Sequence, residues 1–129
     1  MDDGLTERAE ALLDSEPLIG HLATCRDGRP HAAPLWYAVH EGHLELSTTG
    51  RKLANLRTNP KVALSVEKST DGEPVWGVSV QGTARVVEDA SRGDAIIRRV
   101  NRRYGEAEDA WGENTAVVIE VDASSAWAY

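Results

Sequence analysis

Short segments of strand-forming sequence follow one another along the chain, and tight-turn sequences separate several of them. Residues 61–68, KVALSVEK, alternate apolar residues with small or polar ones, as a strand with one buried face does. The sequences DGRP and EGH, at residues 27–30 and 41–43, are typical of turns between antiparallel neighbours. The pattern predicts six strands, at residues 18–25, 31–40, 44–48, 61–68, 75–88 and 115–121.

Two of these segments carry a residue that disturbs regular pairing. Pro34 lies within residues 31–40 and predicts an edge strand or a bulged strand, because proline has no N–H to donate. Gly82 interrupts the long segment 75–88 and predicts a bulge or a bend at a barrel corner. A strand of that length can bend around two sheets, so we expect the sheet to close into an antiparallel barrel.

Three helices are expected at the seams of this sheet. Thr6 is the predicted N-cap of the first helix, which ends before Pro17, and Thr48 or Thr49 caps a short second helix. The third helix is expected at residues 90–104, with an apolar stripe and a C-terminal glycine (Ile96, Ile97, Val100, Tyr104 and Gly105). Residues 106–114 are expected to form a loop, and residues 122–129 an irregular tail. The predicted fold class is mainly β (α+β), with about three short helices.

Length and charge exclude several classes of protein. The 129 residues predict one domain, 1–129, and the net charge of −7 argues against general nucleic-acid binding. The arginines of residues 98–103 lie opposite the apolar stripe, so we expect them to form a solvated helix face. No run approaches the roughly 18 apolar residues that span a membrane. No membrane partner is therefore expected. The acidic N-terminus does not resemble a secretory signal, and the single Cys25 fits a reducing cytoplasm, so a cytoplasmic protein is expected.

An unusual turn precedes the second helix. Thr48, Thr49 and Gly50 are followed by Arg51 and Lys52, two cations in a first helical turn, where the helix dipole repels them. Free backbone N–H groups, threonine hydroxyls and a glycine that lets a ligand approach the backbone would all favour an anion there. A phosphate would also bind both cations. We therefore expect a phosphate site.

Histidines and tryptophans offer other candidate sites. His40 and His43 flank a hairpin turn instead of sharing a helix face, so no metal site is expected. His31, at the start of a strand, is expected to face solvent. The three tryptophans without an obvious place in a small barrel are expected at a ligand or an interface (Trp36, Trp111 and Trp127).

The order PLWY, LSTTGRK, NLRTNPKVALSV and VQGTARVV resembles the pyridoxamine 5′-phosphate oxidase-like split barrels, over residues 15–125. The resemblance implies a six-stranded split β-barrel. It also implies a homodimer with FMN, or a deazaflavin coenzyme in some branches, in two clefts between the protomers.

By position, the resemblance assigns Arg51 and Lys52 to the flavin phosphate. It places Ser47 and Thr48, at the end of a strand, with Thr49 beside them, along the phosphate and ribityl chain. The backbone of residues 31–36, with Pro34, Leu35 and Trp36, would lie along the isoalloxazine ring. Trp127 would bring an aromatic ring from the last strand near the flavin.

Three departures from the family pattern argue against oxidation of pyridoxamine phosphate itself. Gly77 replaces a glutamine, Trp36 or Tyr37 stands at the position of a lysine, and the sequence shows no arginine-rich tail. The expected function is an FMN-binding flavoprotein that acts as an oxidoreductase on an unknown small-molecule substrate, with no catalytic acid or base nominated. The alternatives are a deazaflavin-dependent reductase, with Arg57 near the acidic tail of that coenzyme, and a non-catalytic flavin or haem module. The acidic composition favours FMN.

Overall fold

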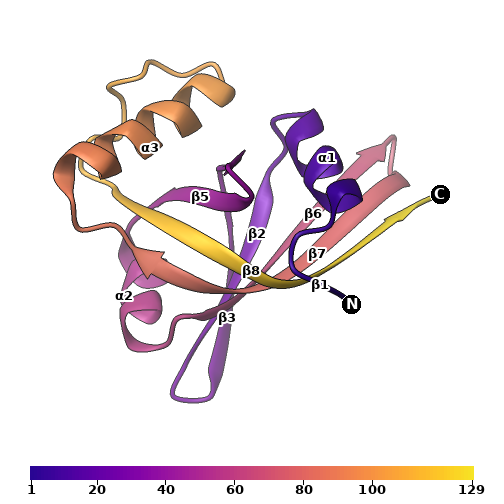
Figure 1. The fold of residues 1–129 in the computed structure, drawn as a ribbon, viewed down its shortest axis with the longest axis horizontal. Coiled ribbons are helices and arrows are strands. Elements are labelled where there is room, and N and C mark those ends of the chain that lie inside the picture. Colours follow the sequence, from indigo (N-terminus) through magenta and orange to yellow (C-terminus); the bar gives the residue numbers. More distant parts are fainter.

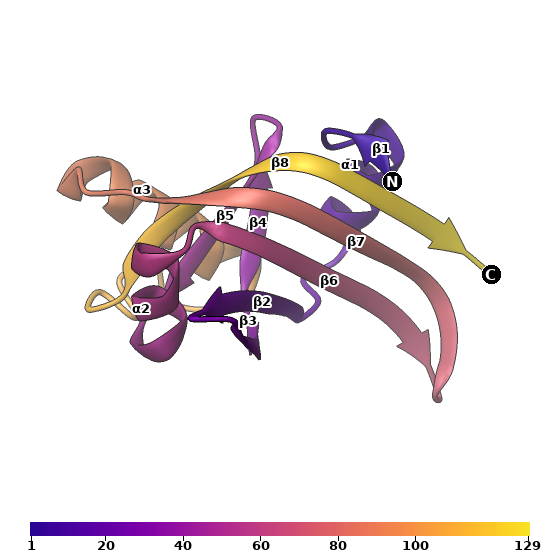
Figure 2. The ribbon, with the colours of Figure 1, turned by 90° about the horizontal axis from the view of Figure 1, so that it is seen from below.

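The computed structural model describes all 129 residues as one antiparallel sheet with three helices (Figure 1). The strands are β1 (Asp2–Asp3), β2 (Gly20–Arg26), β3 (Arg29–Leu35), β4 (Tyr37–His40), β5 (His43–Thr48), β6 (Lys61–Thr70), β7 (Glu73–Val86) and β8 (Thr115–Ala128). The helices are α1 (Glu7–Ser15), α2 (Gly50–Thr58) and α3 (Ala90–Arg103). Figure 2 shows β6, β7 and β8 curving side by side, with α2 and α3 gathered at one end and both termini at the other. No helix is both long and apolar enough to span a membrane.

The segment expected as one strand at residues 31–40 forms two strands at opposite edges of the sheet. Hydrogen-bonded neighbours run in the order β3-β2-β6-β7-β8-β5-β4, and the short β1 pairs separately with β8. The chain passes from one edge to the other at Trp36, two residues after the predicted break at Pro34. The mainly β split barrel implied by the resemblance is therefore confirmed, whereas the expected closure of the sheet is wrong. The barrel is split between β3 and β4, and there are eight strands instead of six.

Edge position explains why β3 tolerates proline. Pro30 and Pro34 are four residues apart, so both direct their missing N–H to the same side of the strand. Because β2 is the only neighbour of β3, that side is the free edge. The prediction of an edge strand from Pro34 is confirmed.

The long strand β7 carries the predicted irregularity, and its partner continues further than expected. The β7–β8 register shifts between Gln81 and Gly82, where Asp122 has no partner, so the bulge predicted at Gly82 is confirmed. The expected irregular tail at residues 122–129 is wrong, since β8 runs to Ala128 along β7. Alanine and serine give this stretch little intrinsic strand preference, and pairing with β7 determines its conformation.

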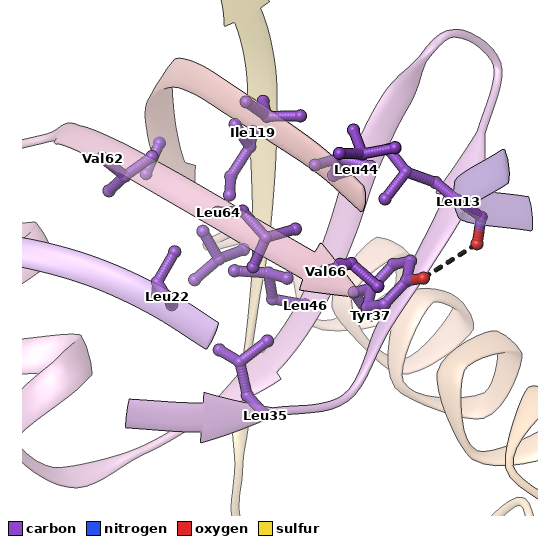
Figure 3. Packing of buried hydrophobic residues seen from close by; sticks show 14 of the residues in the cluster. Leu13, Leu22, Leu35, Tyr37, Leu44, Leu46, Val62, Leu64, Val66 and Ile119 are labelled. Atoms are coloured by element: carbon purple, nitrogen blue, oxygen red, sulfur yellow. Dashed lines mark hydrogen bonds between the residues drawn. The ribbon is translucent and has the colours of Figure 1, made fainter. Parts of the chain in front are cut away.

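Side chains fill the barrel from inside, and helices close it. Leu13 of α1 joins Leu22, Leu64, Ile119 and other apolar residues in the main core (Figure 3). The Tyr37 hydroxyl donates to the Leu13 carbonyl at 2.8 Å, and burial raises the pKa of Tyr37 to about 12. The helix α1 and its N-cap Thr6, whose Oγ1 accepts from the Ala9 N–H, are as predicted.

The helix α3 packs on the outside of the barrel. Its predicted apolar stripe contacts Ala38, Ala116 and Val118, whose side chains face away from the main core. Arg99 binds the buried Glu45 of β5 with two hydrogen bonds, of 2.6 and 3.0 Å. Arg103 donates to the carbonyls of Leu13 and Glu16 at 2.7 and 2.6 Å. The expectation that these arginines only form a solvated face is therefore wrong for Arg99 and Arg103, which anchor α3 to the barrel.

Two glycines provide a matched test of this packing. A Cβ at Gly82 would lie 2.6 Å from the backbone oxygen of Glu120, whereas a Cβ at Gly93 would meet nothing nearer than 3.7 Å. We expect Gly82→Ala to destabilise the protein by about 1–3 kcal/mol through overpacking. Gly93→Ala, inside α3, should stabilise it by about 0.5–1 kcal/mol. Urea unfolding measures both, and a Gly82→Ala variant as stable as the wild type would contradict the bulge geometry.

Candidate functional site

The break between β3 and β4 opens a cleft of about 360 Å³. It is lined by Pro34, Leu35, Trp36, Ser47, Thr48, Thr49, Lys52, Asn101, Trp111 and Asn114. The cleft thus brings together the residues assigned from the sequence to a cofactor, except Arg51 and Trp127. Four separate parts of the chain contribute: the β3–β4 connection, the end of β5, the first turn of α2, and the segment from α3 to β8.

The first turn of α2 keeps its N–H groups free of a side-chain cap. Thr49 occupies the N-cap position, as predicted, but its hydroxyl makes no capping hydrogen bond. The other two helices are capped, α3 by an Asp89 Oδ1 that accepts from the Arg92 N–H at 2.8 Å. The start of α2 therefore combines exposed Arg51 and half-buried Lys52 with unpaired backbone donors, which suits an anion.

Buried polar atoms without a hydrogen-bond partner concentrate around this cleft. There are four in the chain: His31 Nδ1, Thr48 Oγ1, Asn101 Oδ1 and Arg103 Nε. Thr48 and Asn101 line the cleft, and His31 lines the hollow beside it. An unsatisfied buried group costs about 1–3 kcal/mol. Such groups usually have a partner in folded proteins, so these atoms could pair with ordered water or with a bound ligand.

Arg51 lines an adjacent, larger hollow of about 580 Å³ instead of the cleft. Its other lining residues are Arg26, Asp27, Arg29, Pro30, His31 and Asn55, so three guanidinium groups face a single carboxylate. Because Arg51 and Lys52 are consecutive, this basic hollow adjoins the cleft at the start of α2. The expected solvent-facing position of His31 is wrong, since its side chain is half-buried and its Nδ1 is fully so. Arg57 lies elsewhere, paired with Glu88 at 3.1 Å.

The wall formed by Trp36 is held rigidly. Its ring stacks on Tyr104 with centroids 4.7 Å apart and planes within 3°. The Tyr104 hydroxyl donates to the Leu18 carbonyl at 2.6 Å and accepts from the Tyr37 N–H at 3.2 Å. Burial raises the pKa of Tyr104, which keeps this hydroxyl protonated as a donor. Trp36 lines the cleft, and its contact with a cofactor remains a prediction.

Two asparagines of the cleft were missed from the sequence. Asn101 is only 1% exposed, and its Nδ2 donates to the carbonyls of Glu108 and Ala110 at 3.1 and 2.8 Å. Asn114 donates from its Nδ2 to the Ser47 Oγ at 3.1 Å. A signal existed for Asn101, because it follows Ile97 by four residues and so falls on the buried face of α3. Nothing in the sequence around Asn114 indicates its contact.

Trp127 does not reach the cleft of its own chain. It lies near the end of β8 opposite Gly77, where its ring leaves no room for a Cβ. The cleft is at the other end of β8, where Thr115 pairs with Thr48. Trp127 is 38% exposed on the outer face of the sheet.

Several known proteins are similar to this chain. The structure of an F420 reductase is 30% identical with a TM-score of 0.73, over 89% of this chain and 94% of that one. The conserved hypothetical protein Rv2991 from Mycobacterium tuberculosis is 28% identical with a TM-score of 0.81, over 98% and 87%.

A curated relative, the uncharacterized protein RA0666 of Rhizobium meliloti (strain 1021), is 34% identical over 65 residues. That match spans 50% of this chain and 43% of the relative's length. The family model described as pyridoxamine 5′-phosphate oxidase matches residues 5–128. The chain therefore belongs to the pyridoxamine 5′-phosphate oxidase family, with the split-barrel fold.

Proposed function

We propose that the chain is an oxidoreductase that binds a flavin-type cofactor in the cleft between the β3–β4 connection and the start of α2. The observation that carries this proposal is the buried, unpaired Thr48 Oγ1 beside Lys52 and the uncapped first turn of α2. A phosphate at this position would receive hydrogen bonds from the threonine and the backbone, and charge from Lys52. The free Cys25 supports the cytoplasm as the proposed compartment.

The rest of the cleft suits the ring of such a cofactor. Pro34, Leu35 and Trp36 form one wall beside the free edge of β3, and Ser47 precedes Thr48 at the end of β5. When bound, the cofactor would supply the hydride chemistry. The chain's own residues would fix the phosphate, hold the ring against the rigid Trp36–Tyr104 pair, and exclude water.

The basic hollow favours a deazaflavin coenzyme over FMN. FMN ends at its phosphate, so it would leave Arg26 and Arg29 without an anionic partner. A deazaflavin coenzyme continues beyond the phosphate into an acidic tail, which these arginines and Arg51 would bind. The 30% identity to an F420 reductase supports the same choice. FMN remains the second candidate, supported by the phosphate position and by the acidic composition of the chain. A haem module is less well supported, because no histidine, cysteine, methionine or tyrosine lines the cleft to bind iron.

Titration of one set of variants with three ligands tests this proposal. The ligands are FMN, the deazaflavin coenzyme, and the same coenzyme truncated after its phosphate. We expect Lys52→Ala to weaken all three, since a charge-assisted contact is worth about 1.5–3 kcal/mol. Arg26→Ala with Arg29→Ala should weaken only the ligand that keeps its tail. Arg92→Ala, an exposed arginine of α3 distant in sequence from both hollows, is the control.

Two outcomes of the titration would count against the proposal. Affinity of every ligand unchanged by Lys52→Ala would remove the cofactor site from the start of α2. Equal weakening of FMN and the tailed coenzyme by the Arg26 and Arg29 substitutions would remove the argument for a deazaflavin.

We also propose that two copies of the chain associate through the outer face of β2, β6, β7 and β8. Two rows of residues cross the strands on this face, and most of their side chains are small or polar. The rows are His21-Ser65-Ser79-Ser125 and Ala23-Ala63-Gln81-Ala123. The residues of α3 pack instead on strands β4, β5 and β8 around Val118. The exposed Trp127 extends the face at one end, so a two-fold arrangement would offer it to the cleft of the partner.

A charge placed at the centre of this face should separate the copies. We expect Ser79→Arg to yield a monomer that binds the cofactor more weakly, because the partner's Trp127 is lost. Ser91→Arg adds the same charge on the exposed side of α3 and serves as the control. Light scattering over a dilution series, read with cofactor fluorescence, measures both effects. A Ser79→Arg monomer with full cofactor affinity would show that Trp127 contributes nothing to the site.

A further inference from the structure

We propose that Asn101 and Trp111 form a recognition site for the second ligand of the cleft, a neutral, flat molecule that carries a hydrogen-bond donor. This inference rests on the proposed function, since the second ligand is the molecule that reacts with the bound cofactor. Neither residue is assigned to the cofactor phosphate. Asn101 lies three residues before Tyr104, on which Trp36 stacks, so it belongs to the side of the cleft where the ring would lie.

The amide of Asn101 is fixed as an acceptor. Both hydrogens of its Nδ2 are committed to backbone carbonyls, those of Glu108 and Ala110. Those two acceptors also determine which amide atom is the nitrogen. The Oδ1 is left buried without a partner. A ligand N–H or O–H, replacing any water there, would complete it, so the site favours a donor.

Trp111 supplies a flat apolar surface beside that acceptor. It lines the cleft, is 47% exposed, and has a left-handed backbone with φ of 58°. A bulky side chain in this conformation is rare, and the local structure must hold it there. The Trp111 carbonyl accepts from the Asn114 N–H at 2.9 Å, and Asn114 is bonded to Ser47. The backbone of Trp111 is thus fixed beside the cleft, and its indole, which lines the cleft, would stack on a conjugated ring.

Charge around this wall disfavours an anionic ligand. The three residues that the wall contributes to the cleft, Asn101, Trp111 and Asn114, are uncharged. The segment 105–114 carries four carboxylates, Glu106, Glu108, Asp109 and Glu113, and none of them forms an ion pair. Lys52 and Arg51, the cations on the opposite side, are assigned to the cofactor. A second anion would therefore find no cation on this wall to bind it.

Three matched probes test this site on the cofactor-loaded protein: 2-quinolinone, N-methyl-2-quinolinone and 2-quinolinone-4-carboxylate. All are flat and fluorescent, but the second lacks the N–H donor and the third is anionic. We expect 2-quinolinone to bind about 3- to 10-fold more tightly than its N-methyl form, the range of one hydrogen bond to a buried acceptor. The carboxylate should bind more weakly than either.

Variants of Trp111 and Asn101 test the flat surface and the hydrogen-bond acceptor of the site separately. Trp111→Gly relieves the positive φ and removes the ring, so it should fold and bind both neutral quinolinones about tenfold more weakly. It should keep the preference for the N–H form. Trp111→Phe, which keeps a flat ring, is the matched control and should lose little. Asn101→Ala should abolish the preference between the two neutral probes. Should that variant fail to fold, the probe pair and the Trp111 variants still decide the matter.

The cofactor titration is repeated on every variant to separate this inference from the proposed function. Loss of cofactor affinity in Trp111→Gly that matches the loss of probe affinity would show that the wall holds the cofactor instead, and would overturn the inference. Equal binding of the two neutral probes to the wild type would overturn it as well. A wild-type protein that binds no flavin-type cofactor would refute the proposed function itself.

Discussion

One side chain, Tyr104, holds the place where the barrel is split. Its hydroxyl joins the Leu18 carbonyl to the Tyr37 N–H, and its ring supports Trp36 from one side. The chain crosses at this point from β3 to β4, two strands that share no ladder. Without such a support the connection would be free to move, because Trp36 lies between strands and has no pairing of its own. Tyr104 directly follows α3. Its contact with Trp36 therefore completes the packing at this point and also shapes one wall of the cleft.

Around that wall the protein departs from the helix-capping and hydrogen-bonding patterns that it follows elsewhere. The start of α2 lacks the cap that α1 and α3 possess, and it carries two cations where the dipole disfavours them. Three of the four unpaired buried polar atoms lie at the cleft or in the basic hollow beside it. Each departure lowers stability by an amount that a bound anion or a ligand donor would restore. Local inconsistency in an otherwise consistent fold is typical of functional sites.

The features that were predicted correctly from the sequence are those that local patterns determine. Helix boundaries, the bulge at Gly82 and the edge character of the strand around Pro34 follow from capping, glycine and proline chemistry. The split at Trp36 and the extension of β8 to Ala128 depend on pairing between distant segments, which periodicity does not report. Local patterns also do not show where neighbouring side chains point. The sequence assigned Arg51 and Lys52 to one phosphate site, whereas the fold directs them into two adjoining hollows. Asn114 was missed because its importance comes from contact with Ser47, 67 residues earlier.

A crystal structure of the protein with a bound deazaflavin coenzyme tests the central claim most directly. We expect the phosphate within hydrogen-bond distance of the Thr48 Oγ1 and the Lys52 Nζ, with the ring against Trp36 and the acidic tail beside Arg26 and Arg29. A coenzyme bound away from the start of α2, or one whose phosphate leaves the Thr48 hydroxyl unpaired, would contradict it.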